Sequence, residues 1–341
     1  MGELMGHRSR RRFLQGSLAL AGLGLLAGCG VQLPPAQPPA KVPRIGYPEV
    51  NPVTTALVQA QTQAFREGLR ESGYVEGQTI AVELRSADGR VERIPDLVVE
   101  LVQLPVDLIV AVGPSQIREA KNATQTIPVV MVLGNDPVRQ GFVASLARPG
   151  GNVTGLASLN PQLIGKRLQL LKETVPGLSR VAFVWNASPD RAYEVQDAEL
   201  AARALGLHVQ PFEARRPEDL ETVFESAAME GSEAVSLQNN PLTDNYKARI
   251  ADLATRSRLP TMSPYPDFPA NGGLLAYGPN QAALFRRAAY YVDRNLKGTL
   301  PAELPIEQPT TFEFGVNLQT ARAIGLTIPQ EVLLQATEVI Q

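Results

Sequence analysis

The feature that most constrains the fold of this chain is an alternation of strands and helices that runs once and then starts again. The first run alternates short apolar segments with segments whose apolar residues recur at helical spacing. Its expected strands are 45–47, 79–84, 106–112 and 127–133, and its expected helices are 57–72, 94–103 and 115–123. Continuous Val, Ile and Leu strands separated by helices predict a parallel sheet covered on both faces.

The second run has the same order of elements. Its expected strands are 180–185, 207–211, 234–237 and 259–262, and its expected helices are 193–205, 219–229 and 246–256. Short pieces also correspond, because 123–131 in the first run resembles 254–262 in the second. This repeat predicts an α/β fold with two doubly wound parallel-sheet lobes joined by a hinge.

The last part of the chain is expected to cross back between the lobes. It contains a strand near 272–277, a helix over 281–296, a strand around 311–316 and a helical segment from Leu318. We therefore assign 44–157 plus about 279–308 to an N-terminal lobe, and 158–278 plus about 309–341 to a C-terminal lobe. In such a fold the carboxyl ends of the strands face a shared cleft, which is where ligands bind.

The N-terminal segment has the features of an export signal. The stretch 9–15 contains a twin-arginine pattern around Arg10 and Arg11, and an apolar run over 18–28 follows it. The run ends in Leu-Ala-Gly before Cys29, which is a lipobox. It is too short to span a bilayer as a stable helix, so a transmembrane anchor is the weaker alternative.

These features predict a lipoprotein. Residues 1–28 are expected to be removed as a twin-arginine signal peptide, and Cys29 is expected to carry lipid. Residues 29–43 then form a lipidated, Pro-rich tether on the outer side of a bacterial membrane. The stretch 22–27 also matches a G-x-G-x-x-A dinucleotide motif, but no strand precedes it, so its glycines belong to the signal.

Composition excludes several kinds of chemistry. The chain has one cysteine and two histidines, and Cys29 and His7 lie in or beside the signal. A His or Cys zinc site, a Cys-His nucleophile and a Ser-His-Asp triad therefore have no residues in the body of the protein. The remaining histidine, His208, lies in an alternating stretch that favours a half-exposed strand position over a catalytic base. The 32 basic and 34 acidic residues give no basic excess for nucleic acid.

Several stretches in fixed order carry a family resemblance. They are 65–78, 144–155, 165–167, 277–280 and 325–329, with sequences such as Phe-Arg-Glu-Gly-Leu-Arg-Glu-Ser-Gly-Tyr and Ala-Arg-Pro-Gly-Gly-Asn-Val-Thr-Gly. The chain resembles the substrate-binding lipoproteins of ABC transporters in the tryptophan/tyrosine-binding-protein-like family, and the resemblance covers nearly everything after the tether. It implies the type I periplasmic binding fold and a monomer without cofactor or metal. It also implies capture of a small molecule for an ABC permease and its ATPase.

Candidate ligand contacts in the first lobe lie where expected strands end. Gly113 and Ser115 open a helix, so free N–H groups and the positive helix end favour a ligand carboxylate there, although Ser115 is equally explained as an N-cap. Tyr47 follows the first strand and is placed to wall the pocket. Asp136 follows the fourth strand, where it would accept from an ammonium group or cap the next segment.

The second lobe offers equivalent positions. Trp185 and Asn186 end its first strand, and the Trp185 ring suits either a stacking surface or the core. Asn240 ends the third strand, where the resembling proteins commonly carry Asp, so a contact to a cationic amine is weaker there. Tyr277 is expected near the hinge, within reach of the ligand.

Two other functions remain open from the sequence. The same cleft could serve an enzyme that uses carboxylates, but Asp136 is the one carboxylate that we place on a convergent loop. A sensory receptor that passes its closed form to a signalling partner has the same sequence features as a transport protein.

Overall fold

The computed structural model describes residues 41–187 and 191–341 of the 341-residue chain. The predicted signal peptide, Cys29 and most of the predicted tether lie outside the described residues. Residues 42–341 cluster as one unit. In the part of the chain that is described, no helix is both long and apolar enough to cross a membrane.

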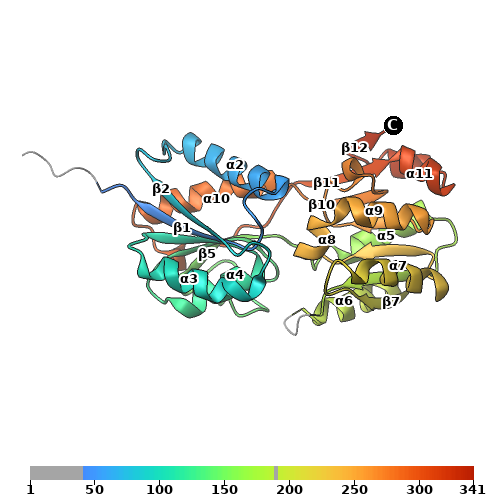
Figure 1. The fold of residues 1–341 in the computed structure, drawn as a ribbon, viewed down its shortest axis with the longest axis horizontal. Helices are drawn as coiled ribbons and strands as arrows, with labels where there is room; N and C mark the ends of the chain where they lie inside the picture. Colours follow the sequence, from blue (N-terminus) through green and yellow to red (C-terminus); the bar gives the residue numbers. More distant parts are fainter. Residues whose placement is uncertain (1–40, 188–190) are drawn as a thin grey trace, which may run out of the picture. The chain divides into compact units, whose positions relative to one another are not determined.

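The first sheet is parallel throughout and has the strand order β2-β1-β3-β4-β5. Its strands are β1 (Arg44–Glu49), β2 (Ala81–Ser86), β3 (Leu108–Val112), β4 (Val129–Gly134) and β5 (Val153–Ala157). Its helices are α2 (Ala56–Glu71), η1 (Val91–Arg93), α3 (Ile94–Gln103), α4 (Gly113–Ala123) and α10 (Gln281–Leu296). Helices α2 and α10 lie on one face, and α3 and α4 on the other (Figure 1). Each face has its own buried core, so the sheet is covered on both sides.

The second sheet has the order β12-β11-β10-β9-β8-β6-β7. Its strands are β6 (Arg180–Trp185), β7 (His208–Glu213), β8 (Ala234–Leu237), β9 (Thr261–Ser263), β10 (Leu275–Pro279), β11 (Phe312–Asn317) and β12 (Glu338–Ile340). The associated helices are α5 (Ile164–Thr174), α6 (Tyr193–Ala204), α7 (Asp219–Met229), α8 (Pro241–Asn245), α9 (Lys247–Arg256), η2 (Pro269–Asn271), α11 (Leu318–Ile324) and α12 (Gln330–Leu333). The pairing of β10 with β11 is antiparallel, and the other strand pairs are parallel.

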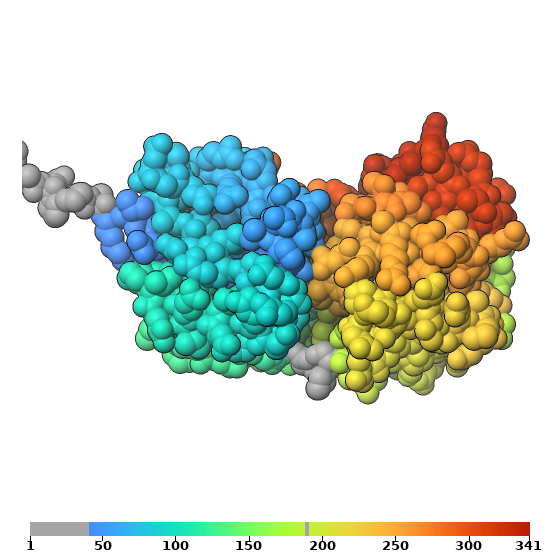
Figure 2. All heavy atoms as spheres, viewed as in Figure 1, coloured from blue at the N-terminus to red at the C-terminus, as the bar shows by residue number. Residues whose placement is uncertain are grey.

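The predicted fold class is confirmed, because the first five strands of each run occupy equivalent places. The order β2-β1-β3-β4-β5 in the first sheet corresponds to β7-β6-β8-β9-β10 in the second. Figure 2 shows the first run, in blue to cyan, gathered in one lobe, and the second run, in yellow to orange, in another. We call these the first and second lobes.

Strands β5 and β12 and helices α5 and α8 are among the elements that the sequence analysis did not predict. Strand β5 contains Gly155 at a φ of +125°, where a Cβ would be 2.2 Å from the Met131 carbonyl oxygen. Helix α5 follows it directly after the crossing to the second lobe. Strand β12 has three residues and exists through its pairing with β11. Long-range contacts of this kind leave no periodic pattern in the sequence.

The described residues cross between the sheets three times, and a buried arginine joins one of the crossings to strand β10. The crossings are 158–163 between β5 and α5, Asn280 between β10 and α10, and 308–311 after η3 (Pro301–Glu303). Arg167 in α5 is 2 % exposed. It donates to the Asn160 carbonyl at 3.0 Å and to the Tyr277 carbonyl at 2.7 Å. Burial lowers the pKa of Arg167 to about 10, so the guanidinium stays charged at neutral pH.

Helices α2 and α10 pack at backbone contact distance over the first sheet. A Cβ at Gly68 in α2 would lie 2.2 Å from the Arg286 carbonyl oxygen of α10. Because that neighbour is backbone, the helices must separate to admit a side chain. Gly68 therefore fixes how closely the segment from the far end of the chain packs on the first lobe.

We expect Gly68→Ala to lower the free energy of unfolding by about 1–3 kcal/mol, because it overpacks this contact. Gly165→Ala is the matched control. Gly165 lies in α5, and a Cβ there would be 3.6 Å from the Ala201 Cβ, which is an ordinary contact. The control should be neutral or gain up to about 1 kcal/mol from helix propensity. Urea denaturation measures both, and equal effects of the two variants would refute the packing argument.

Candidate functional site

The cavity that we take as the candidate site lies at the carboxyl ends of strands from both sheets. In the first lobe it is reached by the residues after β1 and β3, and in the second by those after β6 and β8. These are the points where the strand order reverses, which is where doubly wound sheets bind ligands. The cavity volume of about 450 Å³ falls in the range of small-molecule sites.

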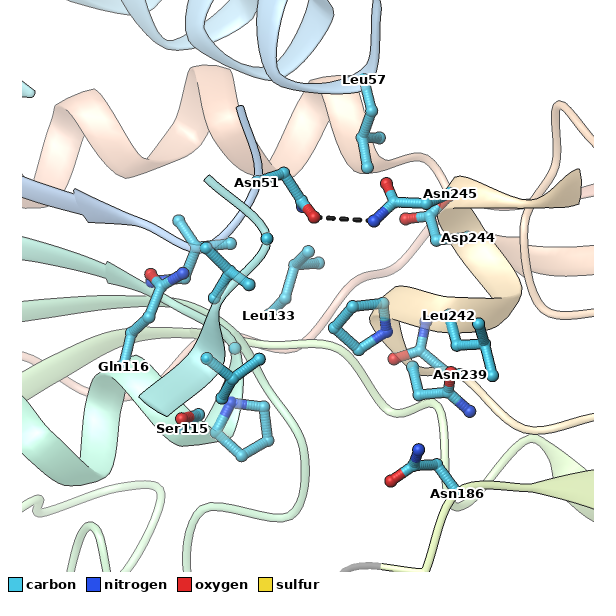
Figure 3. A pocket seen from close by; sticks show the side chains of 18 of the residues that line it. Asn51, Leu57, Ser115, Gln116, Leu133, Asn186, Asn239, Leu242, Asp244 and Asn245 are labelled. Atoms are coloured by element: carbon cyan, nitrogen blue, oxygen red, sulfur yellow. Dashed lines mark hydrogen bonds between the residues drawn. The ribbon is translucent and has the colours of Figure 1, made fainter. Parts of the chain in front are cut away.

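The two walls face one another across this cavity (Figure 3). The first-lobe wall consists of Glu49, Val50, Asn51, Leu57, Gln61, Gly89, Val91, Val112, Gly113, Pro114, Ser115, Gln116, Leu133 and Gln281. The second-lobe wall consists of Asn186, Arg191, Arg215, Pro217, Asn239, Asn240, Pro241, Leu242, Asp244, Asn245, Tyr246 and Tyr265. Amide side chains dominate the polar part of the second wall.

The N-terminus of α4 supplies backbone donors to the first wall. Gly113 has a φ of +78°, which lets the chain turn sharply from β3 into the helix. Val112 is the N-cap residue and makes no side-chain cap, so the alternative that Ser115 is the N-cap is wrong. Ser115 instead lies in the first turn. The first N–H groups of a helix have no intrahelical acceptor and carry the positive end of its dipole, so this turn suits an anionic group.

Glu49 is a cavity residue that the sequence analysis did not identify. Its side chain is 3 % exposed and lines the cavity at the end of β1. Oε1 accepts the Asn51 N–H at 2.9 Å, whereas Oε2 has no hydrogen-bond partner among the described residues. Burial raises the pKa of this carboxyl, and the backbone hydrogen bonds offset part of the rise. The sequence did contain a signal, because Glu49 is an acidic residue at the carboxyl end of an apolar strand.

The first wall contains a residue with a strained backbone conformation near the end of β4. Leu133 lines the cavity with a φ of +57°, in the left-handed region that a bulky side chain rarely adopts. Such a conformation costs on the order of 1–3 kcal/mol and is concentrated at functional sites. The pairing of β4 with β5 shifts register between Met131 and Gly134, so the bulge places Leu133 at the wall.

The second wall is held by a network of amides. Asn186 donates its backbone N–H to Gln238 Oε1 at 3.0 Å and its Nδ2 to the Ala214 carbonyl at 3.1 Å. Asn240 is the N-cap of α8, and its Oδ1 accepts the Thr243 N–H at 3.0 Å in a capping box. Asn240 Nδ2 donates to the same Gln238 oxygen at 3.2 Å. The wall is therefore preorganised before any ligand arrives.

The charged residues of the second wall have partners within their own lobe. Arg191 donates through Nε to Glu194 Oε1 at 2.7 Å. Lys247 Nζ donates to Asp244 Oδ1 at 2.8 Å. Burial raises the pKa of Asp244 to about 6, although Lys247 opposes the rise. Sequence reasoning missed these residues because their pairing depends on the fold.

The lobes also contact one another directly, both at the cavity wall and away from it. Asn245 Nδ2 donates to Asn51 Oδ1 at 2.7 Å, as Figure 3 shows. Arg139 of the first lobe pairs with Asp197 of the second at 3.2 Å, and its guanidinium lies 4.1 Å from the centre of the Tyr193 ring. The cavity is therefore bounded in this conformation by direct contacts between the lobes.

Half of the sequence candidates line this cavity. Gly113, Ser115, Asn186 and Asn240 belong to its wall. Among the described residues, Tyr47, Asp136, Trp185 and Tyr277 do not line it.

Each of these four side chains has another environment. Tyr47 is fully buried in the core with Phe65, and Trp185 packs against a core of the second lobe. Asp136 Oδ1 accepts the Arg139 N–H at 3.2 Å, which is a local cap. The Tyr277 ring stacks on Phe312 at 5.9 Å. Strand alternation explains Trp185, because it points to the same face as the core residue Phe183.

Any effect of Asn240 on binding must be separated from its role as a cap. We expect Asn240→Ala to lower the free energy of unfolding by about 1 kcal/mol through loss of the cap, and Asn240→Asp to retain most of the stability because Asp caps equally well. Asn122→Ala, at an exposed asparagine of α4 away from the N-cap of that helix, serves as the control without a capping role. Guanidinium denaturation measures the three variants. If Asn240→Asp is as unstable as Asn240→Ala, the capping role is wrong.

Comparison with known proteins now adds to this geometry. A tyrosine-binding protein of Clostridioides difficile (strain R20291) is 23 % identical over 265 residues, which are 77 % of this chain and 76 % of that protein. A conserved domain protein from Vibrio cholerae has a similar structure, with a TM-score of 0.82 and 23 % identity over 88 % of this chain and 100 % of that one. The ABC domain from Streptococcus pneumonia in complex with L-Trp has a TM-score of 0.81, with the same identity and coverage.

At these identities the similar structures bear on the fold alone. Residues 51–340 match the family model described as ABC transporter substrate binding protein, which is nearly all of the chain after the tether. The family resemblance inferred from the sequence is thereby confirmed. The chain belongs to the family of ABC transporter substrate-binding proteins.

Proposed function

We propose that this protein is an extracytoplasmic lipoprotein that captures a small molecule between its two lobes and delivers it to an ABC importer. The observation that carries the proposal is a single cavity lined by strand ends of both sheets. Binding by both lobes is what a capture protein needs, because the ligand is then enclosed and the enclosed form differs from the empty one. The partners would be a membrane permease and its ATPase.

The chemistry of the walls supports an amino acid or another small carboxylate as the ligand. The first turn of α4 offers N–H groups to a carboxylate, and Leu57, Leu133 and Leu242 offer apolar surface. Amides of the second wall supply further donors and acceptors. A relative is named as a tyrosine-binding protein, and a similar structure contains L-Trp, which agrees with a cavity of this character.

Closure is the step that ligand binding would control. The contacts between Asn51 and Asn245, and between Arg139 and Asp197, can form only when the lobes are close. A ligand shifts this equilibrium by the difference between its affinities for the closed and open forms. Contacts to both walls provide that difference, because an open form would offer one wall at a time.

We expect L-tyrosine, L-tryptophan or another L-amino acid to bind the soluble domain and to reduce its radius of gyration. Calorimetry over the set of L-amino acids and small-angle scattering measure the two effects. Ser115→Ala, in the first turn of α4, should weaken binding by up to about tenfold, because it removes a polar contact. Ser226→Ala, in α7, is the control and should leave affinity unchanged.

Solutes captured from a cell extract and identified by mass spectrometry extend the test beyond amino acids. Binding without compaction, or a captured solute that Ser115→Ala and cavity variants do not affect, would contradict capture between the lobes.

The anchor is supported by the sequence. The lipobox before Cys29 and the Pro-rich stretch that follows are what a lipid-tethered binding protein requires. Cys29 is also the only cysteine of the chain, so it is the only side chain that thioether lipidation can use. Two or three acyl chains would hold the protein on the membrane, where one would not.

We expect the protein expressed in its bacterium to incorporate a labelled fatty acid, and Cys29→Ser to abolish the label. Ser17→Ala, just before the apolar run of the signal, should retain it. Gel fluorescence after metabolic labelling reads the result, and mass spectrometry of the N-terminal peptide should find a lipidated Cys29 as the first residue. Persistent labelling of Cys29→Ser would refute the anchor.

A further inference from the structure

Glu49 is the one carboxylate on the cavity wall that has no cationic partner among the described residues. The other acidic wall residue, Asp244, pairs with Lys247 at 2.8 Å. Glu49 forms no ion pair with the described residues, and its Oε2 has no hydrogen-bond partner there. The neighbouring donor on that wall, Gln61 Nε2, is already directed to Gln281 Oε1 at 3.2 Å.

This arrangement is costly to the empty protein. A buried carboxylate loses hydration, and that loss is offset only by a cation or by enough hydrogen bonds. The Asn51 N–H serves Oε1 at 2.9 Å, which leaves the second oxygen unserved. Burial raises the pKa of Glu49 for the same reason. A positively charged group of a bound ligand would therefore stabilise this unpaired carboxylate at the cavity wall.

The neighbouring strand, β3, leads into a helix turn that suits a negatively charged group of the ligand. Strands β1 and β3 are paired, so Glu49, the last residue of β1, and the first turn of α4 after β3 lie at adjacent strand ends. Neighbouring strands are separated by about 4.8 Å. The first turn of α4, which suits a carboxylate, and Glu49, which suits an amine, thus lie at neighbouring strand ends of one lobe. Groups at adjacent strand ends of one lobe fit a ligand that carries an ammonium group and a carboxylate close together.

We propose that Glu49 is an anionic subsite that binds a cationic amine of the ligand next to the carboxylate-binding turn of α4, and that it makes the site selective for amine-bearing acids over their amine-free analogues. This inference rests on the proposed function. It assigns the amine to Glu49 in place of Asp136, which does not line the cavity and whose Oδ1 accepts from Arg139. It also explains how Asn240 can be neutral, because the amine is bound on the opposite wall.

The test combines one variant with paired probes. Glu49→Gln keeps the shape of the side chain and an acceptor for the Asn51 N–H but removes the charge. The probes are L-tyrosine with 3-(4-hydroxyphenyl)propionate, and L-tryptophan with indole-3-propionate, so each pair differs in the amine. Calorimetry on the wild type should find the amino acid bound about ten- to a hundredfold more tightly than its amine-free partner. In Glu49→Gln this preference should largely disappear, because the two changes remove the same interaction.

Two controls separate this role from a structural one. Glu71→Gln, at an exposed glutamate of α2, should keep the wild-type preference. Ligand-free Glu49→Gln should be at least as stable to urea as the wild type, since it relieves a buried unpaired charge. A clear loss of stability in the ligand-free variant would indicate a structural partner for Glu49 and would overturn the subsite.

The outcomes also distinguish the subsite from the proposed function. If the amine-free acids bind the wild type as tightly as the amino acids, or if Glu49→Gln weakens both members of a pair equally, the subsite is wrong and solute capture stands. If only amine-free solutes bind in the cavity, the subsite is likewise wrong. If no solute binds in the cavity at all, the proposed function fails and the subsite fails with it.

Discussion

The constraint on which the rest of the structure depends is the parallel pairing of five strands in the same order in both lobes. Parallel strands place all their carboxyl ends at one edge of the sheet, and an order that reverses beside the first strand leaves a gap between the loops that leave it. Here that happens once beside β1 and β3 and again beside β6 and β8. Those loops supply a large part of the cavity wall, and helices α2, α8 and α10 and the segments after β2 and β7 supply much of the rest.

The lobes are linked by one buried hydrogen-bond network and by weaker contacts that are partly exposed. Arg167 is buried and donates to carbonyl groups of one crossing segment and of strand β10, so removing it would leave buried acceptors without a donor. The contacts that hold the lobes together elsewhere are modest. Arg139 and Asp197 are 47 % and 32 % exposed, and an ion pair of that kind contributes about 0–1 kcal/mol. The buried contact therefore costs more to break than the exposed ion pair between the lobes.

The sequence predicted the fold better than the site, for physical reasons. Buried parallel strands are continuous apolar runs, and this local signal gave helices such as α7 and α10 with their observed bounds. It also placed Gly113, Ser115, Asn186 and Asn240 correctly at strand ends, because the end of a buried apolar run marks where the chain reaches the edge of the sheet. Which of them binds a ligand remains a prediction.

The sequence-based predictions were wrong where the outcome depends on the direction of a side chain or on its partners in the fold. Whether a strand's last side chain points to the core or to the cavity depends on register, and Trp185 points to the core. Glu49 matters because no described residue forms an ion pair with it and its Oε2 has no hydrogen-bond partner there. A missing partner of this kind leaves no local pattern in the sequence. Arg191 and Asp244 likewise became wall residues through the loops that carry them. Sequence reasoning therefore identifies the edge of the sheet, whereas the structure identifies the atoms that remain unpaired there.

The central claim is that one small molecule is bound by both lobes in this cavity. A crystal structure of the soluble domain grown with L-tyrosine or L-tryptophan, or with the solute that copurifies, tests it most directly. The account predicts ligand density between the strand ends, with an amine about 3 Å from the Glu49 carboxylate, the carboxylate at the first turn of α4, and further contacts to the amides of the second wall. Density for the ligand on one lobe alone, or outside the cavity, would contradict it.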